Sequence, residues 1–226
     1  MTEPPATTLS NLTTRLLLIL GDASANRFTS EITGEAWRLA LAEYSYAVPN
    51  IASKMFTVTN AGREQPLPVS GETEEDTPLF SGLISITQVL FPWFPDGEEA
   101  APYPQYSFYF SGGEPVVYIG GPRTPAVGDQ LRISYASTHT MDDLAGAAVC
   151  TVPSHDFELL LLGAAGHAAR LRTAIYSESF SNHPELKAFA IDNLKQYRDT
   201  LRTMRRQSSR QPLPAQGFKL DNWDGG

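Results

Sequence analysis

The sequence predicts an α+β protein in which a helical bundle carries an inserted all-β module. Apolar residues recur at helical spacing near both ends of the chain. Short β-branched and aromatic runs, separated by turns that contain Gly, Pro or Asp, fill the middle. Two helical pairs separated by a β module would most simply pack together. We therefore expect a helical bundle (1–50 and 142–210), an antiparallel sandwich-like or barrel-like β module (51–141) and an extended C-terminal tail (211–226).

The first fifty residues are expected to form two helices. The apolar segment TTRLLLIL (13–20) would end at the Gly-Asp pair that follows it. The second helix should begin near Thr29 or Ser30, either of which can cap it, and should end at Pro49. Its apolar side chains fall on one face, which is formed by Ile32, Ala36, Leu39, Ala40 and Tyr44.

The middle of the chain has the features of a β module. Five segments are rich in β-branched and aromatic residues, and turn-forming sequences such as PDGEE and SGGEP separate them. The predicted strands are FTVT (56–59), LISITQVLF (83–91), YSFYF (106–110), PVVYI (115–119) and QLRISYA (130–136). From Arg63 to Asp129 there are ten acidic residues and two basic ones, so the module should carry an acidic rim.

A third helix should open at Pro153 and Ser154. Its apolar stripe would consist of Phe157, Leu160, Leu161, Ala164, Ala168 and Leu171. Gly163 and Gly166 lie within it, although glycine costs about 1 kcal/mol in a helix interior relative to alanine. The favoured explanation is close packing against another helix, where a side chain would clash.

A fourth helix should begin near Pro184, a residue suited to the first helical position. Apolar residues recur along it at intervals of four and three: Leu186, Ala190, Leu194, Tyr197, Leu201 and Met204. From Leu186 to Arg210 there are seven Lys or Arg and two Asp, against the acidic trend of the chain. These cations form either a solvated face that complements the helix dipole, or a surface that docks onto an acidic partner or DNA phosphates.

The segment QPLPAQGFKLDNWDGG (211–226) contains two prolines and few apolar residues, which predicts an extended tail. Its apolar residues nevertheless recur at spacings of two and three, as in a peptide that lies along a neighbouring surface. The candidate partner-binding residues are therefore cations of the last helix and anchors of the tail: Lys195, Arg198, Arg202, Arg205, Arg206, Arg210, Phe218, Leu220 and Trp223.

Composition narrows the classes of function. The chain has 226 residues, a formal net charge of −8 and a pI near 5.0, which argues against a general nucleic-acid binder. Cys150 is the single cysteine, so no intramolecular disulfide and no cysteine-based metal site is expected, and the four histidines lack zinc-site spacing. The N-terminus lacks the pattern of a secretory signal, and the most apolar stretch (157–169) is too short to span a membrane. We expect a soluble protein made in the cytoplasm.

The stretch SYASTHTMDD (134–143) is the strongest candidate for catalysis. A Ser/His/Asp hydrolase would use Ser134 or Ser137 with His139 and one of the two following aspartates. However, the chain contains no GxSxG elbow, and these residue types commonly cap backbone N–H groups where a strand gives way to a helix. We therefore favour a strand-to-helix turn. The glycine runs lack phosphate-loop spacing and ETEED (72–76) lacks calcium-loop spacing, so no catalytic, cofactor-binding or metal-binding residue is predicted.

Three segments of the chain carry a family resemblance. LLLILGDASANRFTSEITGEAWRLALAEYSYAVPN (16–50) combines a short helix, a Gly-Asp break and a second helix that ends at a proline. GPRTPAVGDQLRISYASTHTM (121–141) would be the last strand of the β module and its exit, and VPSHDFELLLLGAAGHAARLRTAIYSE (152–178) the helix that follows. In this order they resemble the head-to-tail adaptor (connector) proteins of tailed bacteriophages. The β insert from 55 to 120 is not matched residue by residue.

The resemblance implies a structural virion protein of the phage neck that catalyses no reaction. Adaptors of this family assemble as a ring, commonly of twelve copies, under the portal protein. They extend the DNA channel and present a surface for stopper or tail proteins. The implied partners are therefore neighbouring copies, the portal and a tail-side protein. DNA would pass through without sequence-specific binding, no membrane or cofactor would be involved, and assembly would take place in the host cytoplasm.

Two other classes of function remain open. One is a minor tail protein whose β module binds carbohydrate or protein through aromatic side chains, for which the candidates are Trp93, Tyr103, Tyr106, Phe108 and Tyr109. The alternation in YSFYF also suits an ordinary sheet core. The other class is a small hydrolase that uses His139.

Overall fold

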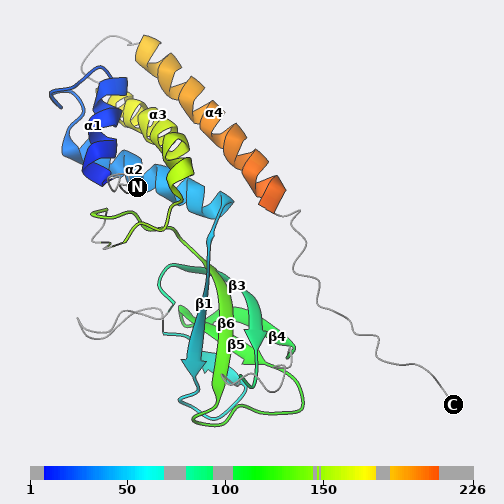
Figure 1. Ribbon diagram of the computed structural model, residues 1–226. Helices are drawn as coiled ribbons and strands as arrows, with labels where there is room; N and C mark the ends of the chain where they lie inside the picture. The colour runs from blue at the N-terminus through cyan, green and yellow to red at the C-terminus, as the bar shows by residue number, and fades with distance from the viewer. Residues whose placement is uncertain are drawn as a thin grey trace, which may run out of the picture.

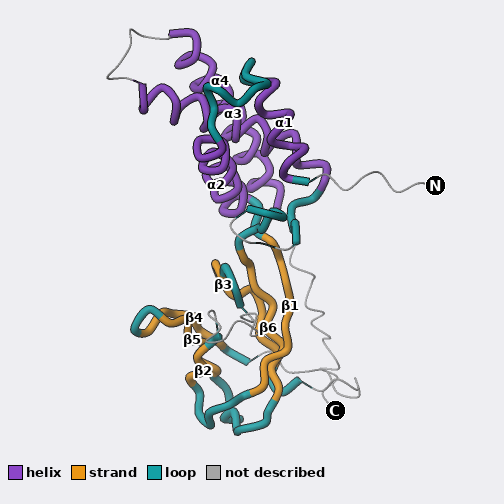
Figure 2. Tube along the Cα trace, turned by 90° about the vertical axis from the view of Figure 1, so that its left-hand side faces the viewer, coloured by secondary structure: helices purple, strands orange, loops and turns teal. Residues whose placement is uncertain are grey.

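Four helices and two small antiparallel sheets make up the computed structural model, which describes residues 8–68, 80–93, 104–144, 147, 149–176 and 184–208. The helices are α1 (Leu9–Ile19), α2 (Ser30–Ala47), α3 (Phe157–Tyr176) and α4 (Pro184–Ser208), and a short 3-10 turn (Ser154–Asp156) precedes α3. The strands are β1 (Asn50–Thr57), β2 (Glu64–Pro66), β3 (Leu83–Leu90), β4 (Tyr106–Ser111), β5 (Glu114–Ile119) and β6 (Gln130–Ser137). The helices gather at one end of the molecule and the strands at the other (Figures 1 and 2). The predicted α+β class is confirmed.

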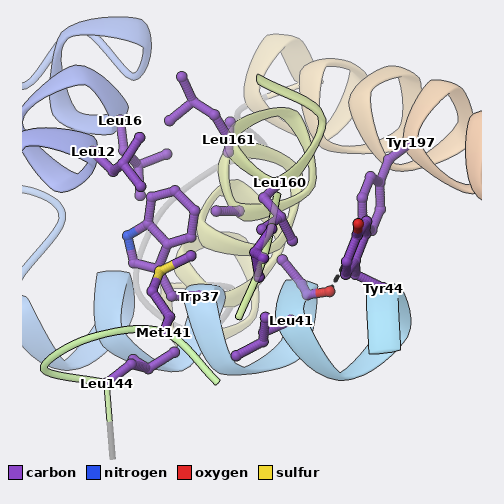
Figure 3. Packing of buried hydrophobic residues seen from close by; sticks show 14 of the residues in the cluster. Leu12, Leu16, Trp37, Leu41, Tyr44, Met141, Leu144, Leu160, Leu161 and Tyr197 are labelled. Carbon is purple, nitrogen blue, oxygen red and sulfur yellow. Dashed lines mark hydrogen bonds between the residues drawn. The ribbon is translucent and has the colours of Figure 1, made fainter. Parts of the chain in front are cut away.

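The helical end is built around α3, which packs against α1, α2 and α4 (Figure 1). Leucines of α1 and α3 surround Trp37 of α2, and Tyr197 of α4 lies beside the same core (Figure 3). The Trp37 indole N–H donates to Thr13 Oγ1 (3.1 Å), and the Tyr197 hydroxyl donates to the Ala40 carbonyl (2.6 Å). These bonds let large rings be buried without leaving their polar atoms unpaired.

The two glycines of α3 lie where α4 approaches. A Cβ atom on Gly163 would stand 2.8 Å from ring carbons of Tyr197, and one on Gly166 would stand 2.8 Å from Cγ of Leu194. Real side chains do not approach so closely, so a larger residue would push the two helices apart. The close packing predicted for these glycines is confirmed.

The strands form two three-stranded sheets, ordered β1-β6-β3 and β2-β5-β4, with every neighbouring pair antiparallel. Both sheets contribute to one apolar core, which includes Phe56, Val89, Leu131 and Ile133 from the first sheet and Val117 and Ile119 from the second. The described strands close no barrel. The β module is therefore a pair of small sheets that share a core.

Some predicted element boundaries were wrong. β1 begins at Asn50 and pairs with β6 along its whole length, whereas the sequence predicted a strand from 56 to 59. As an edge strand with mostly exposed residues, β1 has no regular apolar alternation to reveal it. β2 was missed because it is three residues long and ends in a proline. The predicted α2 start holds, although the Thr29 side chain makes no capping bond.

The exit from β6 also differs from the prediction. Residues 137–143 do not lead directly into a helix, because the 3-10 turn before α3 starts at Ser154. The Thr140 hydroxyl instead donates to the Val149 carbonyl (2.7 Å), and the Thr140 N–H donates to Thr151 Oγ1 (2.8 Å). The hydroxyls of this stretch pair two loop segments with each other rather than capping a helix.

Candidate functional site

The outer side of α4 carries the candidate cations. Lys195, Arg202, Arg205 and Arg206 are exposed, while the apolar side of the same helix is buried against α3. Arg202 lies 3.0 Å from Asp199 one turn earlier, an exposed pair that leaves the guanidinium in water. These four of the six predicted cations face solvent, and Arg198, the fifth that the structure describes, is also exposed.

Arg198 has a different environment because it also holds two helices together. Its guanidinium donates to both carboxylate oxygens of Glu43 on α2, at 2.6 and 3.0 Å. This hydrogen bond lowers the pKa of Glu43 and raises the pKa of Arg198, so both groups stay charged. Arg198 remains 44% exposed and can still contact a partner with its outer edge. Sequence reasoning did not anticipate its pairing with Glu43, since the two residues are far apart in the chain.

His167 lies beneath this ion pair. The side chain is 1% exposed, and its Nε2 stands 3.5 Å from Glu43 Oε1. Neither ring nitrogen makes a hydrogen bond within the described part of the chain. Burial lowers the pKa of His167 to about 4, with Arg170 and Arg198 acting in the same direction and Glu43 opposing them. The ring is therefore neutral at neutral pH.

The remaining predicted partner-binding residues, namely Arg210, Phe218, Leu220 and Trp223, lie outside the described residues.

His139 lies where the chain passes between the sheets and the helices. Its Nε2 is 2.9 Å from the Val48 carbonyl, and its Nδ1 is 3.0 Å from the Thr151 carbonyl and 3.1 Å from the Thr151 hydroxyl. Its backbone N–H donates to Ser45 Oγ (2.9 Å), and its ring lies 5.1 Å from that of Tyr44. One residue thus connects the end of α2, the exit of β6 and the segment before α3.

The hydrogen bonds of His139 fit a neutral ring. A neutral imidazole has one N–H, which can donate from Nε2 to the Val48 carbonyl while Nδ1 accepts from the Thr151 hydroxyl. Burial lowers the pKa of His139, although the bonds to the Val48 and Thr151 carbonyls work against this. The ring therefore acts as a neutral structural connector between these segments.

A second buried hydrogen bond stabilises the same junction between α2 and the segment before α3. The Tyr44 hydroxyl donates to Asp156 Oδ2 at 2.5 Å, which ties α2 to the turn before α3. Burial, together with the negative charge of Asp156, raises the pKa of Tyr44 well above its ordinary value. We call the set Tyr44, Ser45, Val48, His139, Thr151 and Asp156 the junction network.

The structure does not bring the suggested hydrolase residues together. Ser134 Oγ lies 3.4 Å from Ser53 Oγ, and Ser137 pairs with Asn50 across β1 and β6. In the described part of the chain, no hydrogen bond joins His139 to either serine or to the two aspartates at 142 and 143. The geometry assigns His139 to holding the junction.

The aromatic residues proposed for carbohydrate binding have different surroundings. Tyr106 and Phe108 pack against the core of the β module, as the alternation in YSFYF predicts. Trp93 instead has the Arg132 guanidinium 4.9 Å from its ring centre, and the backbone N–H of Trp93 donates to the Gln130 carbonyl (2.9 Å). Tyr103 lies outside the described residues. The described aromatics do not make one stacking platform.

The described residues contain neither a cluster of metal ligands nor a membrane-spanning helix. No group of three or more His, Cys, Asp or Glu side chains there could hold a metal ion. None of the described helices combines the length and apolar character that crossing a membrane requires. The loop ETEED (72–76) lies outside the described residues.

No family model and no curated protein matches the chain. Solved structures similar to it include a chain from the neck of an empty GTA particle, computed with C6 symmetry. That chain is 17% identical, and the match covers 80% of this chain and 84% of that one with a TM-score of 0.32. A chain from the neck of a native GTA particle, computed with C12 symmetry, is 14% identical, with 87% and 92% coverage and a TM-score of 0.31. Likeness at this level carries no functional argument by itself.

Proposed function

We propose that this chain is a head-to-tail adaptor of a phage-type neck, which forms a ring under the portal, extends the DNA channel and provides a docking surface for stopper or tail proteins. The observation that carries the proposal is the row of exposed cations along α4 on an otherwise acidic chain. Such a row is suited to an acidic protein surface.

The arrangement of the three resembling segments supports the same proposal. They correspond to the end of α1 with α2, to β6 with its exit, and to α3. The helices among them pack in one bundle although the β module separates them in sequence. The order of elements is therefore the order that the resemblance implies for an adaptor.

The proposed portal contact is the exposed face of α4. The helix has 25 residues and is therefore about 37 Å long at 1.5 Å per residue. Lys195, Arg202, Arg205 and Arg206 would meet acidic groups of the portal, and Arg198 would join them with its outer edge. The acidic β module would face the tail side, and an acidic channel lining would let DNA slide without sticking.

Charge reversal on α4 tests the portal contact. Lys195→Glu, alone and with Arg202→Glu, should weaken binding to purified portal rings by about tenfold or more, because each change turns attraction into repulsion. Lys54→Glu, an exposed lysine on β1, is the matched control and should bind normally. Co-sedimentation at two salt concentrations measures the effect, since attraction between exposed charges weakens with salt. Equal binding by the α4 and β1 variants would remove α4 from the contact.

The ring itself is tested by mass. Light scattering of the chain mixed with portal should give a complex that contains one closed ring of adaptor copies, and the expected number is about twelve. Adaptors can stay monomeric until the portal is present, so the mixture is the deciding sample. Deleting 211–226 should abolish portal capture while thermal unfolding stays unchanged. Full portal capture by the truncated chain would refute the role of the tail.

A further inference from the structure

A groove of about 760 Å³ lies between the end of α1, the loop before α2, the end of α3 and the start of α4. These elements meet at one end of the helical bundle (Figure 1). Its apolar wall is formed by Leu20, Phe28, Leu186 and Phe189. Phe28 is buried in a small cluster that Leu20 and Leu186 complete. Ile19 at the rim is 49% exposed. The groove thus offers apolar surface that the described chain leaves accessible.

The loop that forms one wall is held rigidly. The buried carboxylate of Asp22 accepts the backbone N–H groups of Asn26 (3.2 Å), Arg27 (2.6 Å) and Phe28 (2.7 Å). Burial alone would raise the pKa of Asp22, but these three bonds outweigh it and lower that pKa. A preformed wall of this kind reduces the entropy cost of binding a ligand.

The charged groups at the groove are mainly positive. Arg27 and Arg172 line it together with one carboxylate, Glu185. The Arg172 guanidinium lies 5.0 Å from the centre of the Phe28 ring and donates to the Arg27 carbonyl. These contacts hold a cation directly beside the apolar wall. The groove therefore suits a peptide that carries large apolar side chains and carboxylates close together.

We propose that this groove receives the C-terminal segment (211–226) of a neighbouring copy of the same chain. That segment contains the sequence FKLDNWD (218–224), in which the apolar residues Phe218, Leu220 and Trp223 are accompanied by two carboxylates, Asp221 and Asp224, and one cation, Lys219. The apolar side chains match the wall of the groove and the aspartates match its arginines. Aromatic anchors in a preformed pocket are typical of residues that dominate binding energy.

The length of α4 favours a neighbouring copy over the same chain. The groove lies at the first turns of α4, whereas the tail follows Ser208 at the opposite end of this 25-residue helix (Figure 1). From Ser208 to Phe218 a fully extended chain spans at most about 33–36 Å, and the α4 residues that line the groove lie about 28–36 Å from Ser208 along the helix. Returning to its own groove would thus require a nearly fully extended run back along α4. The groove of a neighbouring copy does not impose this constraint.

A contact of this kind has a consequence for assembly. The tail of each copy and the groove of the next are different surfaces, and such heterologous contacts form a ring when the rotation between successive copies closes. The inference therefore rests on the proposed ring and names the surface through which each copy holds the next. In this arrangement the tail joins neighbouring copies and the cations of α4 meet the portal, so deleting 211–226 would abolish portal capture by preventing ring formation.

Peptide binding tests the groove without the portal. A labelled synthetic peptide with the sequence 211–226 should bind the full-length chain in fluorescence anisotropy. Arg172→Glu should weaken this binding by about tenfold, because it replaces attraction by repulsion. A peptide with Asp221→Lys and Asp224→Lys should bind the Arg172→Glu chain better than the natural chain. Binding that is absent, or unaffected by Arg172→Glu, overturns the proposal; absent binding is also the result expected if residues 177–183, which lie outside the described residues, occupy the groove.

Disulfide trapping decides between the same chain and a neighbour. In a Cys150→Ser background, chains with Ile19→Cys at the groove rim are mixed with chains that carry Asn222→Cys in the tail. Crosslinked pairs of the two chains should form on oxidation, and Val127→Cys, an exposed position outside the bundle, should not form them. A chain that carries both Ile19→Cys and Asn222→Cys and yields only an internal crosslink, with no pairs in the mixture, overturns docking between copies.

The test of the groove and the test of the portal contact can fail independently of each other. Loss of portal binding by the α4 variants with normal tail trapping would leave the groove contact standing and point to another assembly of the same chain. Normal portal binding by the natural chain, with no trapping of its tail in the groove of another copy, would refute the inference alone.

Discussion

The bundle interior and the junction network each bury a histidine, but the two rings differ in their hydrogen bonding. His139 has a hydrogen-bonding partner for both ring nitrogens, whereas His167 has none within the described chain. His167 is surrounded by helices whose approach depends on glycine, at contacts that leave no room for another carbon atom. This difference indicates that the close packing of side chains determines the structure of the bundle, whereas hydrogen bonds determine that of the junction. Changes in volume should therefore harm the first, and changes in polarity the second.

The largest effect is expected from adding one methyl group inside the bundle. Gly163→Ala should lower the free energy of unfolding by about 1–3 kcal/mol, because the new carbon overlaps the ring of the fully buried Tyr197. Gly34→Ala is the matched control, since its added carbon would meet only the end of the Arg38 side chain at 3.9 Å. It should raise stability by about 0.5–1 kcal/mol through helix propensity. Urea unfolding measures both, and effects of the same sign would contradict control by shape.

The two histidines provide the direct comparison. His139→Leu should cost about 1–3 kcal/mol, because it leaves the partly buried Val48 carbonyl without its side-chain partner and removes the bond to the Thr151 hydroxyl. His167→Leu should be close to neutral or stabilising, since no hydrogen bond is lost and a buried polar ring is removed. Chemical denaturation of both variants at neutral pH gives the comparison. A larger loss for His167→Leu would reverse the assignment of the two regions.

The pH dependence of stability sharpens the same contrast. Burial lowers the pKa of His167 to about 4 in the folded chain, from an ordinary value of 6.5. As the pH falls through this window the unfolded chain binds a proton first, so stability present at neutral pH is lost towards acid. His167→Leu should therefore lose less stability than the natural chain between about pH 7 and pH 5. His139 acts in the same direction in both proteins, so identical pH profiles would show that His167 is not the group responsible.

The smallest effect is expected at the surface. Arg15 and Glu158 form an ion pair between α1 and α3 in which both side chains are largely exposed. Glu158→Gln should change stability by less than about 0.5 kcal/mol, because water screens such pairs. A loss comparable to that of His139→Leu would mean that surface charges, rather than the two buried regions, hold α1 in place.

The bundle was the part of the fold that could be predicted from the sequence. Its helices are indicated by the local spacing of apolar residues, and Gly163 and Gly166 predict a tight crossing because they interrupt an otherwise strong helical pattern. Most strands were found for the same reason. β1 was placed too late, because an edge strand with mostly exposed residues lacks regular alternation.

Less of the candidate site could be predicted from the sequence. The cations of α4 could be found as a charge excess on one helix, and all of those on the described helix are exposed. The link between Arg198 and Glu43, the buried position of His167 and the role of His139 depend on contacts between distant segments. No pattern within a short stretch carries such information. The groove at the far end of the bundle likewise arises from four separate segments.

The register at the junction has an evolutionary consequence. Asn50 and Ser137 are cross-strand partners, so the β module enters and leaves the bundle at points about 5 Å apart. Because the two ends of the insertion lie so close together, the bundle places little constraint on the length or sequence of the inserted module. Related chains could thus carry a different β module, with different binding partners, on the same helical bundle.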